Sequence, residues 1–300
     1  MVAIDLGSNT LRILQYDCST EKYIGIYEKI VKTADGLAQH GVIKNEAVLK
    51  IIAGLEEAKK QLGITYDDVV AVTTEALRRA SNANEVLDRI KRASGVSFKV
   101  ISGDEEARLT LLAVKYRLAK LHYASNKFVL IDIGGGSTEL IFHYADKIIS
   151  KSFPIGIVTI AQSYQDLDSI RRALPREMLD IERFCMETYA EYGKVNSFVA
   201  TAGTPTTVAA MKLGQTYACY NPIKINGTSI IQKELDLYLK KLLDMSLDER
   251  EIAVGVGRSD LIAAGILIYK QLFNIVEFDS CVVIDDGLRE GVALDHCSNV

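Results

Sequence analysis

Apolar residues fall into short runs along the chain, and stretches with a helical period separate these runs from one another. In the first half the runs predict strands at about 1–7, 10–17, 22–33, 68–74 and 97–101. The second half repeats the pattern and predicts strands at about 127–133, 137–144, 147–153, 196–201 and 277–284. Strands that alternate with helices over the whole length predict an α/β fold with a largely parallel core.

The two halves begin with similar segments. VAIDLGSNTLRIL (residues 2–14) aligns with VLIDIGGGSTELIF (residues 129–142), and each reads as strand, aspartate, glycine turn and second strand. Asp5 and Asp132 are equivalent in this alignment, 132 − 5 = 127 residues apart, which is about one domain length. The repeat predicts two similar domains, at about 1–122 and 123–300, with a hinge near residues 119–127. The last helix, at about 287–300, is expected to be able to pack back on the first domain.

Capping residues mark the ends of the predicted helices. Asn45 can serve as the N-cap of a helix that stops at Gly63. In ISGDEEAR, Ser102 can cap a second long helix, and Glu105 can complete a capping box with it. Glu106 has no such capping duty, although an acid in the first turn of a helix can also act simply through the helix dipole.

Composition narrows the classes of function. The 300 residues are 48% hydrophobic with a formal net charge of −4 and a pI of about 5.7, which argues against a protein that coats nucleic acid. No signal peptide and no membrane-spanning run is evident, so we expect a soluble, cytoplasmic protein without a membrane partner. The five scattered cysteines lack CxxC spacing, so we expect neither a disulfide framework nor a zinc site.

The two glycine turns are candidate anion sites. Glycine allows positive φ and close approach of the backbone to a ligand, and successive amides can then form a positively polarised nest. The candidate phosphate-binding residues in the two turns are Gly7, Ser8, Asn9, Gly134, Gly135, Gly136, Ser137 and Thr138. An aspartate before each turn would repel bare phosphate, which points to Mg²⁺ between them. The alternative is a pair of ordinary hairpins in which glycine only serves turn geometry.

Other nucleotide-binding motifs are missing from the sequence. There is no GxxxxGK[ST] segment, and GGGST is followed by ELIF, which reads as a strand and not as the helix of a GxGxxG motif. Paired hairpin phosphate clamps that face one cleft are typical of the duplicated, ribonuclease H-like domains of the actin, sugar kinase and Hsp70 ATPase fold. We therefore expect this two-domain actin-like fold.

The sequence further resembles the exopolyphosphatase and guanosine pentaphosphate phosphatase (Ppx/GppA) family. The resemblance rests on an ordered set of segments: AIDLGSNTLRIL, TTEALRRASN, VISGDEEARL, IDIGGGSTEL, TAGTPTTVAA, INGTSI and DGLREGV. It implies hydrolysis of a terminal phosphoanhydride of polyphosphate or of guanosine pentaphosphate (pppGpp), with Mg²⁺, or Mn²⁺ in its place. It also implies a short form that consists of the catalytic core alone, for which processive action on long chains is doubtful.

The same resemblance assigns roles to individual residues. It makes Glu106 the general base, Arg78 a phosphate ligand and Glu139 a metal ligand together with Asp5 and Asp132. The alternatives are a helix-dipole acid for Glu106 and an exposed strand residue for Glu139, and Arg79 reads as a surface charge. The sequence leaves ligand contacts open for four further residues, Thr204, Thr206, Arg258 and Arg289.

Two rival functions fit the same fold. One is a small-metabolite kinase, which would need an acceptor pocket and an adenine site. The other is a regulator that binds guanosine polyphosphates or polyphosphate without hydrolysing them. Fold alone cannot choose among these, because one scaffold hosts many activities. The sequence also leaves open whether the protein forms a homodimer.

Overall fold

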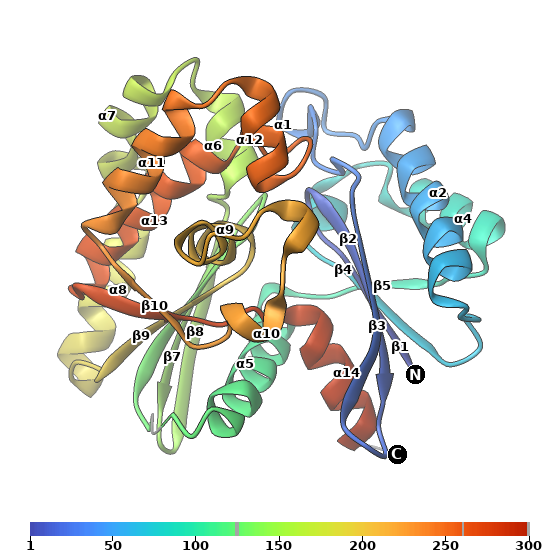
Figure 1. The fold of residues 1–300 in the computed structure, drawn as a ribbon, viewed down its shortest axis with the longest axis horizontal. Helices are drawn as coiled ribbons and strands as arrows, with labels where there is room; N and C mark the ends of the chain where they lie inside the picture. The colour runs from blue at the N-terminus through green and yellow to red at the C-terminus, as the bar shows by residue number, and fades with distance from the viewer. Residues whose placement is uncertain (124–125, 260, 299–300) are drawn as a thin grey trace. The chain divides into compact units, whose positions relative to one another are not determined.

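A computed structural model of the chain describes residues 1–123, 126–259 and 261–298, and it divides into two compact units (Figure 1). Unit 1 comprises Met1–Ala113 and Gly287–Val300, and unit 2 comprises Val114–Asp286. The division falls within helix α5 (Gly103–Lys120), so this helix contributes to both units. The hinge predicted near residues 119–127 includes residues 124–125, which lie outside the described residues.

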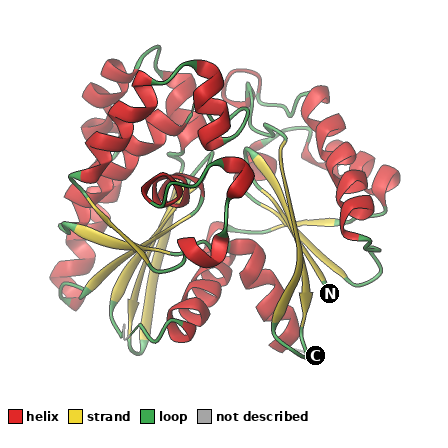
Figure 2. Cartoon of the chain, in the orientation of Figure 1, coloured by secondary structure: helices red, strands yellow, loops and turns green. Residues whose placement is uncertain are grey.

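Unit 1 contains a five-stranded mixed sheet with the strand order β3-β2-β1-β4-β5 (Figure 2). Its strands are β1 (Val2–Leu6), β2 (Thr10–Asp17), β3 (Lys22–Ile30), β4 (Val69–Thr73) and β5 (Phe98–Val100). Its other helices are α1 (Leu37–His40), α2 (Asn45–Leu62), α3 (Glu75–Arg79), α4 (Ala83–Ser94) and α14 (Leu288–Ser298). Strands β1, β4 and β5 run parallel, so their carboxyl ends meet at one edge of the sheet.

The two faces of this sheet are covered by different helices. Leu14 and Tyr16 of β2 join a buried cluster with Leu109 of α5 and with Leu288 and Val292 of α14. Side chains alternate along a strand, so Leu11 faces the opposite side, where it lies against Gly54 of α2. The C-terminal helix α14 thus forms part of the core of unit 1.

Unit 2 repeats this architecture in a six-stranded sheet with the order β10-β11-β9-β6-β7-β8. Its strands are β6 (Phe128–Ile133), β7 (Thr138–Tyr144), β8 (Lys147–Phe153), β9 (Ser197–Thr201), β10 (Thr228–Ile231) and β11 (Ser280–Val283). Its helices are α6 (Ile157–Ser163), α7 (Leu167–Glu177), α8 (Leu179–Tyr192), α9 (Gly203–Lys212), α10 (Pro222–Ile225), α11 (Glu234–Asp244), α12 (Leu247–Val254) and α13 (Ile262–Val276), with a 3₁₀ turn at Tyr217–Cys219. The almost wholly buried α13 forms the centre of its helical layer.

Strand predictions from the hydrophobic pattern are confirmed, with short corrections at the ends. The strand predicted to reach residue 33 stops at Ile30, because Lys32 adopts φ 54° and breaks the extended backbone. The strand predicted from residue 277 starts at Ser280, because Glu277 adopts φ 56° as the C-cap of α13. The pattern missed the edge strand β10, which has only 4 residues.

The predicted caps are partly wrong. Lys44 holds the N-cap position of α2 and Asn45 lies inside the helix, whereas Gly63 ends the helix at φ 63° as expected. Ser102 Oγ does accept a hydrogen bond from the amide of Glu105, at 3.2 Å. The carboxylate of Glu105, however, binds Arg108 through both of its oxygens, at 2.8 and 2.9 Å. Glu105 therefore pairs with Arg108, and this pairing takes the place of the hydrogen bond from the amide of Ser102 that would complete a capping box.

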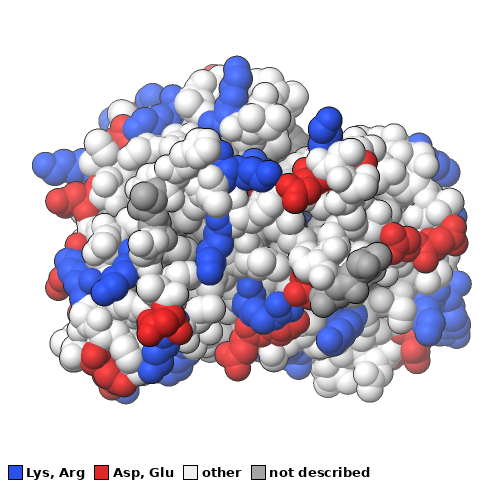
Figure 3. Space-filling model, turned by 90° about the horizontal axis from the view of Figure 1, so that it is seen from below, with Lys and Arg blue, Asp and Glu red and all other residues white. Residues whose placement is uncertain are grey.

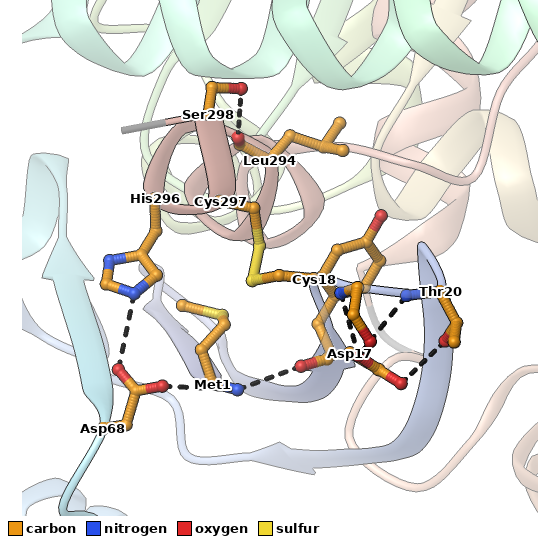
Figure 4. Close-up of a disulfide and its surroundings, with 11 residues drawn as sticks. Met1, Asp17, Cys18, Thr20, Asp68, Leu294, His296, Cys297 and Ser298 are labelled. Carbon is orange, nitrogen blue, oxygen red and sulfur yellow. Dashed lines mark hydrogen bonds and ion pairs between the residues drawn. A yellow bond between two sulfur atoms is a disulfide. The ribbon is translucent and has the colours of Figure 1, made fainter. Parts of the chain in front are cut away.

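A disulfide contradicts the expectation from cysteine spacing. Cys18, just after β2, is bonded to Cys297 in the last turn of α14, with their Cα atoms 5.4 Å apart (Figure 4). Beside it the N-terminal amine of Met1 donates to the carbonyl of Tyr16 and lies 3.4 Å from Asp68. Spacing rules could not reveal this pair, because 279 residues separate the two cysteines and only the docking of α14 brings them together.

None of the helices in the described part of the chain has both the length and the apolar character needed to cross a membrane. On the face shown in Figure 3, acidic and basic side chains are interspersed.

Loss of the disulfide should destabilise unit 1. In the chain-entropy account a bridge that closes so long a loop stabilises the fold by about 5 kcal/mol at most. We expect Cys297→Ser, or reduction of the wild type, to lower the thermal midpoint of unfolding. Cys219→Ser is the control, since Cys219 is an exposed free cysteine. Identical midpoints with and without reductant would contradict a stabilising role.

Candidate functional site

The two hairpin turns have the same geometry in their separate units. In unit 1 the amide of Gly7 donates to the carbonyl of Thr10 at 3.0 Å, and in unit 2 the amide of Gly134 donates to that of Ser137 at 2.9 Å. The spacing of 127 residues between the repeats therefore holds through the turns, since 134 − 7 and 137 − 10 both equal 127. The internal repeat seen in the sequence is a structural repeat.

The carbonyl oxygens of each turn are held by the backbone that follows the third strand of its unit. In unit 1, the amides of Val31 and Ala34 donate to the carbonyls of Asn9 and Ser8, at 2.9 and 2.7 Å. In unit 2, the amides of Ile157 and Val158 donate to the carbonyls of Gly134 and Gly135, at 3.0 and 2.8 Å. These bonds leave the negative ends of the peptide dipoles already satisfied within the protein.

The amide groups of the turns are left for another partner. Within the described residues, no hydrogen bond is donated by the amides of Ser8, Asn9, Gly135 or Gly136. Amides that cluster in this way form the positively polarised nest that binds anions. This geometry favours an anion at both turns, and the binding of phosphate there stays a prediction.

Of the two properties for which glycine was expected in the turns, positive φ does not occur. None of Gly7, Gly134, Gly135 and Gly136 has positive φ. Space is what requires glycine at position 134, where a Cβ would lie 3.0 Å from the carbonyl oxygen of Ser137. At Gly7 the corresponding distance to Thr10 is an ordinary 3.6 Å. Glycine in the second turn thus serves close packing and uncovered amides, and the positive φ that glycine permits is not used in either turn.

Gly156 is a supporting residue that sequence reasoning missed. A Cβ on Gly156 would lie 2.4 Å from the carbonyl oxygen of Gly135 and 2.6 Å from the amide nitrogen of Gly136. The start of α6 therefore presses directly on the GGG turn. The only sequence signal was an isolated glycine after a strand, which a turn anywhere on the surface would also produce.

The remaining predicted residues of unit 1 collect near the carboxyl ends of β1, β4 and β5. Asp5 is buried near the end of β1, and the hydroxyl of Thr73 at the end of β4 donates to the carbonyl of Leu6 at 2.8 Å. Arg78 lies on α3 after β4, and Glu106 lies in the first turn of α5 after β5. Arg78 Nη1 donates to Glu106 Oε2 at 3.0 Å, so these two predicted residues are in contact.

The charge of Arg78 is balanced by two carboxylates. Its Nε and Nη2 donate to Glu75 Oε2, at 3.3 and 3.0 Å, and its Nη1 also donates to the carbonyl of Ile101 at 2.7 Å. Burial alone would lower the pKa of Arg78, but the charge and hydrogen bond of Glu106, with those of Glu75, raise it above its ordinary value. Arg79 is exposed and lies 3.9 Å from Glu75, as expected for a surface charge.

In unit 2 the predicted metal ligands face one another across a strand pair. Asp132 of β6 is directly opposite Glu139 of β7 in the antiparallel register, so both side chains lie on the same face of the sheet. Glu139 is only 1% exposed, which excludes the exposed-strand alternative, and its Oε1 accepts a hydrogen bond from Ser152 at 2.7 Å. The hydroxyl of Thr138 donates to the carbonyl of Ile155, at 2.6 Å.

The equivalent pair in unit 1 has opposite charges. Asp5 is directly opposite Arg12, and Arg12 takes the place of Glu139 in the repeat because 139 − 12 is also 127. Opposite charges across an antiparallel pair attract, whereas the two acids of unit 2 repel one another. Sequence reasoning missed Arg12, although the alignment of residues 2–14 with residues 129–142 contained the signal.

Carboxylate chemistry fits a hard divalent cation at Asp132 and Glu139. Magnesium is commonly held by one or two carboxylates together with phosphate oxygens. Among the described residues, no group of three or more His, Cys, Asp or Glu side chains is arranged to hold a metal. The pair of acids therefore fits a cation that is completed by a ligand, and the predicted three-acid set with Asp5 stays a prediction.

The four residues whose ligand contacts were left open by the sequence all have contacts within the protein. Thr206 Oγ1 donates to the carbonyl of Ala202 at 2.8 Å, while Thr204 is fully buried against Gly265 of α13. The guanidinium of Arg258 lies over the ring of Tyr217, and Arg289 pairs with the neighbouring Glu290.

Pro205 lies in the first turn of α9, where proline is tolerated.

Ala202, between β9 and α9, is a backbone outlier in this region. It adopts φ 71° and ψ −170°, a combination that residues with a side chain rarely occupy. Its carbonyl accepts bonds from both the amide and the hydroxyl of Thr206, at 3.2 and 2.8 Å. The turn is therefore held against its intrinsic preference by the helix that follows it.

Adding one methyl group at Gly156 should disrupt the second turn. The new Cβ would meet backbone atoms that cannot move aside cheaply, so we expect Gly156→Ala to destabilise unit 2 by about 1–3 kcal/mol. Gly203→Ala is the matched control, because a Cβ there meets nothing within 4 Å. Denaturant unfolding measures both variants, and equal stabilities would show that the turn does not depend on this packing.

Comparisons with known proteins agree with this geometry. The family model described as Ppx/GppA phosphatase family matches residues 22–299. Exopolyphosphatase 1 of Mycobacterium tuberculosis is 26% identical over 300 residues, covering 97% of this chain and 86% of the relative. The Ppx/GppA enzyme of Aquifex aeolicus is similar in structure, with a TM-score of 0.75, 30% identity and 98% of each chain covered. An exopolyphosphatase structure from Cytophaga hutchinsonii matches the fold with a TM-score of 0.84 at 21% identity, over 100% of this chain and 98% of the other.

These matches extend over nearly the whole chain and confirm the predicted duplicated actin-like fold. The strand orders of the two units show the same duplication. The chain is therefore a hydrolase that belongs to the Ppx/GppA phosphatase family.

Proposed function

We propose that the protein removes the terminal phosphate from inorganic polyphosphate by hydrolysis of the last phosphoanhydride bond. The observation that carries this proposal is the repeated turn, in which both units direct carbonyls into the protein and leave amides for an anion. The phosphates of a polyphosphate chain are anions that backbone amides of this kind can bind. Relatives that match nearly the full length of this chain are named exopolyphosphatases, which agrees with this choice.

Glu106 would act as the general base. It would accept a proton from a water molecule whose oxygen attacks the terminal phosphorus while the bond to the bridging oxygen breaks. The products are orthophosphate and a chain shortened by one phosphate. Glu106 is 9% exposed and lies in the first turn of α5, so it is held on a rigid element beside a cation, Arg78. A general base typically contributes a factor of about 10²–10⁴.

Asp132 and Glu139 would hold Mg²⁺, or Mn²⁺ in its place. The support is the difference between the repeats: unit 1 places Arg12 opposite its aspartate, and unit 2 places a second acid there. Two carboxylates on one face favour an external cation, which would neutralise charge on the phosphates as the bond breaks. Asp5 is the third acid that the sequence predicts for this role.

Guanosine pentaphosphate is the second candidate substrate. Its terminal phosphate is joined by the same kind of anhydride bond, and the family name covers enzymes of both types. The turns bind phosphates through backbone amides, which do not distinguish between the two phosphate chains. The preference between polyphosphate and guanosine pentaphosphate is therefore determined by measuring orthophosphate release from each of them with the same preparation of the protein.

Replacing the general base should abolish turnover with little change in binding. We expect Glu106→Gln to lower the rate of orthophosphate release from polyphosphate by at least about a hundredfold. Glu105→Gln is the matched control, because Glu105 is the adjacent acid in the same helical turn and its carboxylate pairs with Arg108 instead of Arg78. Unchanged phosphate release by Glu106→Gln would contradict the assignment.

Phosphate transfer to an acceptor without net hydrolysis would favour a kinase, and tight binding without release would favour a regulator.

Removal of divalent metal should stop the reaction. We expect EDTA to abolish orthophosphate release and added Mg²⁺ to restore it. Glu139→Gln keeps an acceptor for Ser152 but removes one charge, so it should need about tenfold or more Mg²⁺ for half-maximal rate. Glu57→Gln, an exposed acid of unit 1 paired with Lys29, serves as the control. Full activity in EDTA would overturn the metal site.

A further inference from the structure

Glu75 is an acidic side chain whose partner is the predicted phosphate ligand. Its side chain is 15% exposed, and it lies three residues before Arg78 on the five-residue helix α3. Glu75 Oε2 accepts from both Nε and Nη2 of Arg78. An acid held against a phosphate-binding arginine opposes anion binding by simple charge, so its presence at this point calls for a reason.

Counting donors shows how fully Arg78 is engaged. A guanidinium has five N–H groups, and four hydrogen bonds are made here: two to Glu75, one to the carbonyl of Ile101 and one to Glu106. The Nε and Nη2 edge therefore belongs to Glu75, and the Nη1 group is divided between a fixed carbonyl and Glu106. A phosphate that binds Arg78 through more than one donor must displace one of these partners.

The partners differ in how easily they can be displaced. The carbonyl of Ile101 is part of the backbone, whose amide in turn donates to the carbonyl of Thr73 at 3.0 Å. Glu75 is on the same helix as Arg78, so its pairing is local and survives movement of neighbouring elements. Glu106 comes from a different helix, α5. In the proposed reaction its carboxylate must be available to accept a proton from the attacking water molecule. Glu106 is thus the partner that phosphate can replace.

We propose that Glu75 is a positioning residue that holds Arg78 by its Nε and Nη2 edge, so that Nη1 can pass from Glu106 to a substrate phosphate. This inference rests on the proposed function, because it assigns Arg78 to phosphate and Glu106 to water. Glu75 does not touch the reacting atoms, and it acts through Arg78 alone. Without it, the guanidinium loses two of its four hydrogen bonds and its fixed orientation.

Binding of inorganic tripolyphosphate, measured by calorimetry at constant salt in EDTA, where we expect hydrolysis to stop, tests this role without turnover. A positioning role for Glu75 and a simple effect of its charge predict opposite changes in the affinity for tripolyphosphate. Removal of an acid should tighten anion binding if charge alone matters, whereas loss of positioning should weaken it. We expect Glu75→Ala to raise the Kd about tenfold and Glu75→Gln, which keeps an acceptor, to stay near wild type. Glu75→Asp keeps the charge but shortens the reach, so it should fall between them and serves if the alanine variant folds poorly.

A double-mutant cycle separates an effect through Arg78 from a general effect on the fold. In an Arg78→Gln background, Glu75→Ala should cause no further loss of tripolyphosphate affinity. The matched control is Glu105→Ala, because Arg108 lies between Glu105 and Asp295 as Arg78 lies between Glu75 and Glu106. We expect no loss of affinity in this control.

The outcomes separate this inference from the proposed function. Tighter or unchanged binding by Glu75→Ala, or equal losses in both backgrounds, would overturn the role of Glu75 even if the wild type hydrolyses polyphosphate. A wild type that binds tripolyphosphate but releases no orthophosphate from polyphosphate would overturn the proposed function, while the binding cycle would still decide the role of Glu75. A wild type that does not bind tripolyphosphate would overturn both.

Discussion

Backbone hydrogen bonding at the two hairpin turns is the constraint on which the site depends. Each turn is tight enough to leave several peptide groups without partners in the hairpin itself. The backbone after β3 in unit 1, and the start of α6 in unit 2, take up the carbonyls and leave the amides. A buried loop usually has to satisfy both kinds of group, so this one-sided satisfaction favours an anion at the turns, as we propose. The requirement explains why Gly156 must approach Gly135 so closely.

Duplication gives the units the same frame but different charges. The register across the first two strands is conserved between the units, and the residue opposite the aspartate changes from Arg12 to Glu139. Unit 1 thereby has a cationic side chain at this position, and unit 2 has the pair of acids that we propose as metal ligands. A similar backbone thus holds two different arrangements of charge in the two units.

A partly buried cluster of charged side chains lies at the end of the parallel strands in unit 1. Arg78 joins α3, the end of β5 and α5 through Glu75, Ile101 and Glu106. Breaking a buried pair by removing one partner is costly, since the remaining charge is left without compensation. The cluster therefore links the stability of this region to the placement of the predicted base, and the disulfide to α14 reinforces the same unit elsewhere.

The sequence by itself determined the duplication and every strand except the short edge strand β10, and it proposed the candidate residues of the two turns. Alternating apolar positions and the two aspartate–glycine segments depend on neighbours close in the chain, which is the information that a sequence carries directly. The ordered motifs likewise led to the family. Pairings over long separations depended on tertiary structure: Cys18 with Cys297, Gly156 against Gly135, and Arg78 with Glu106. These contacts form only after separate strands and helices have packed, so no local pattern could have specified them, and only the fold decided them.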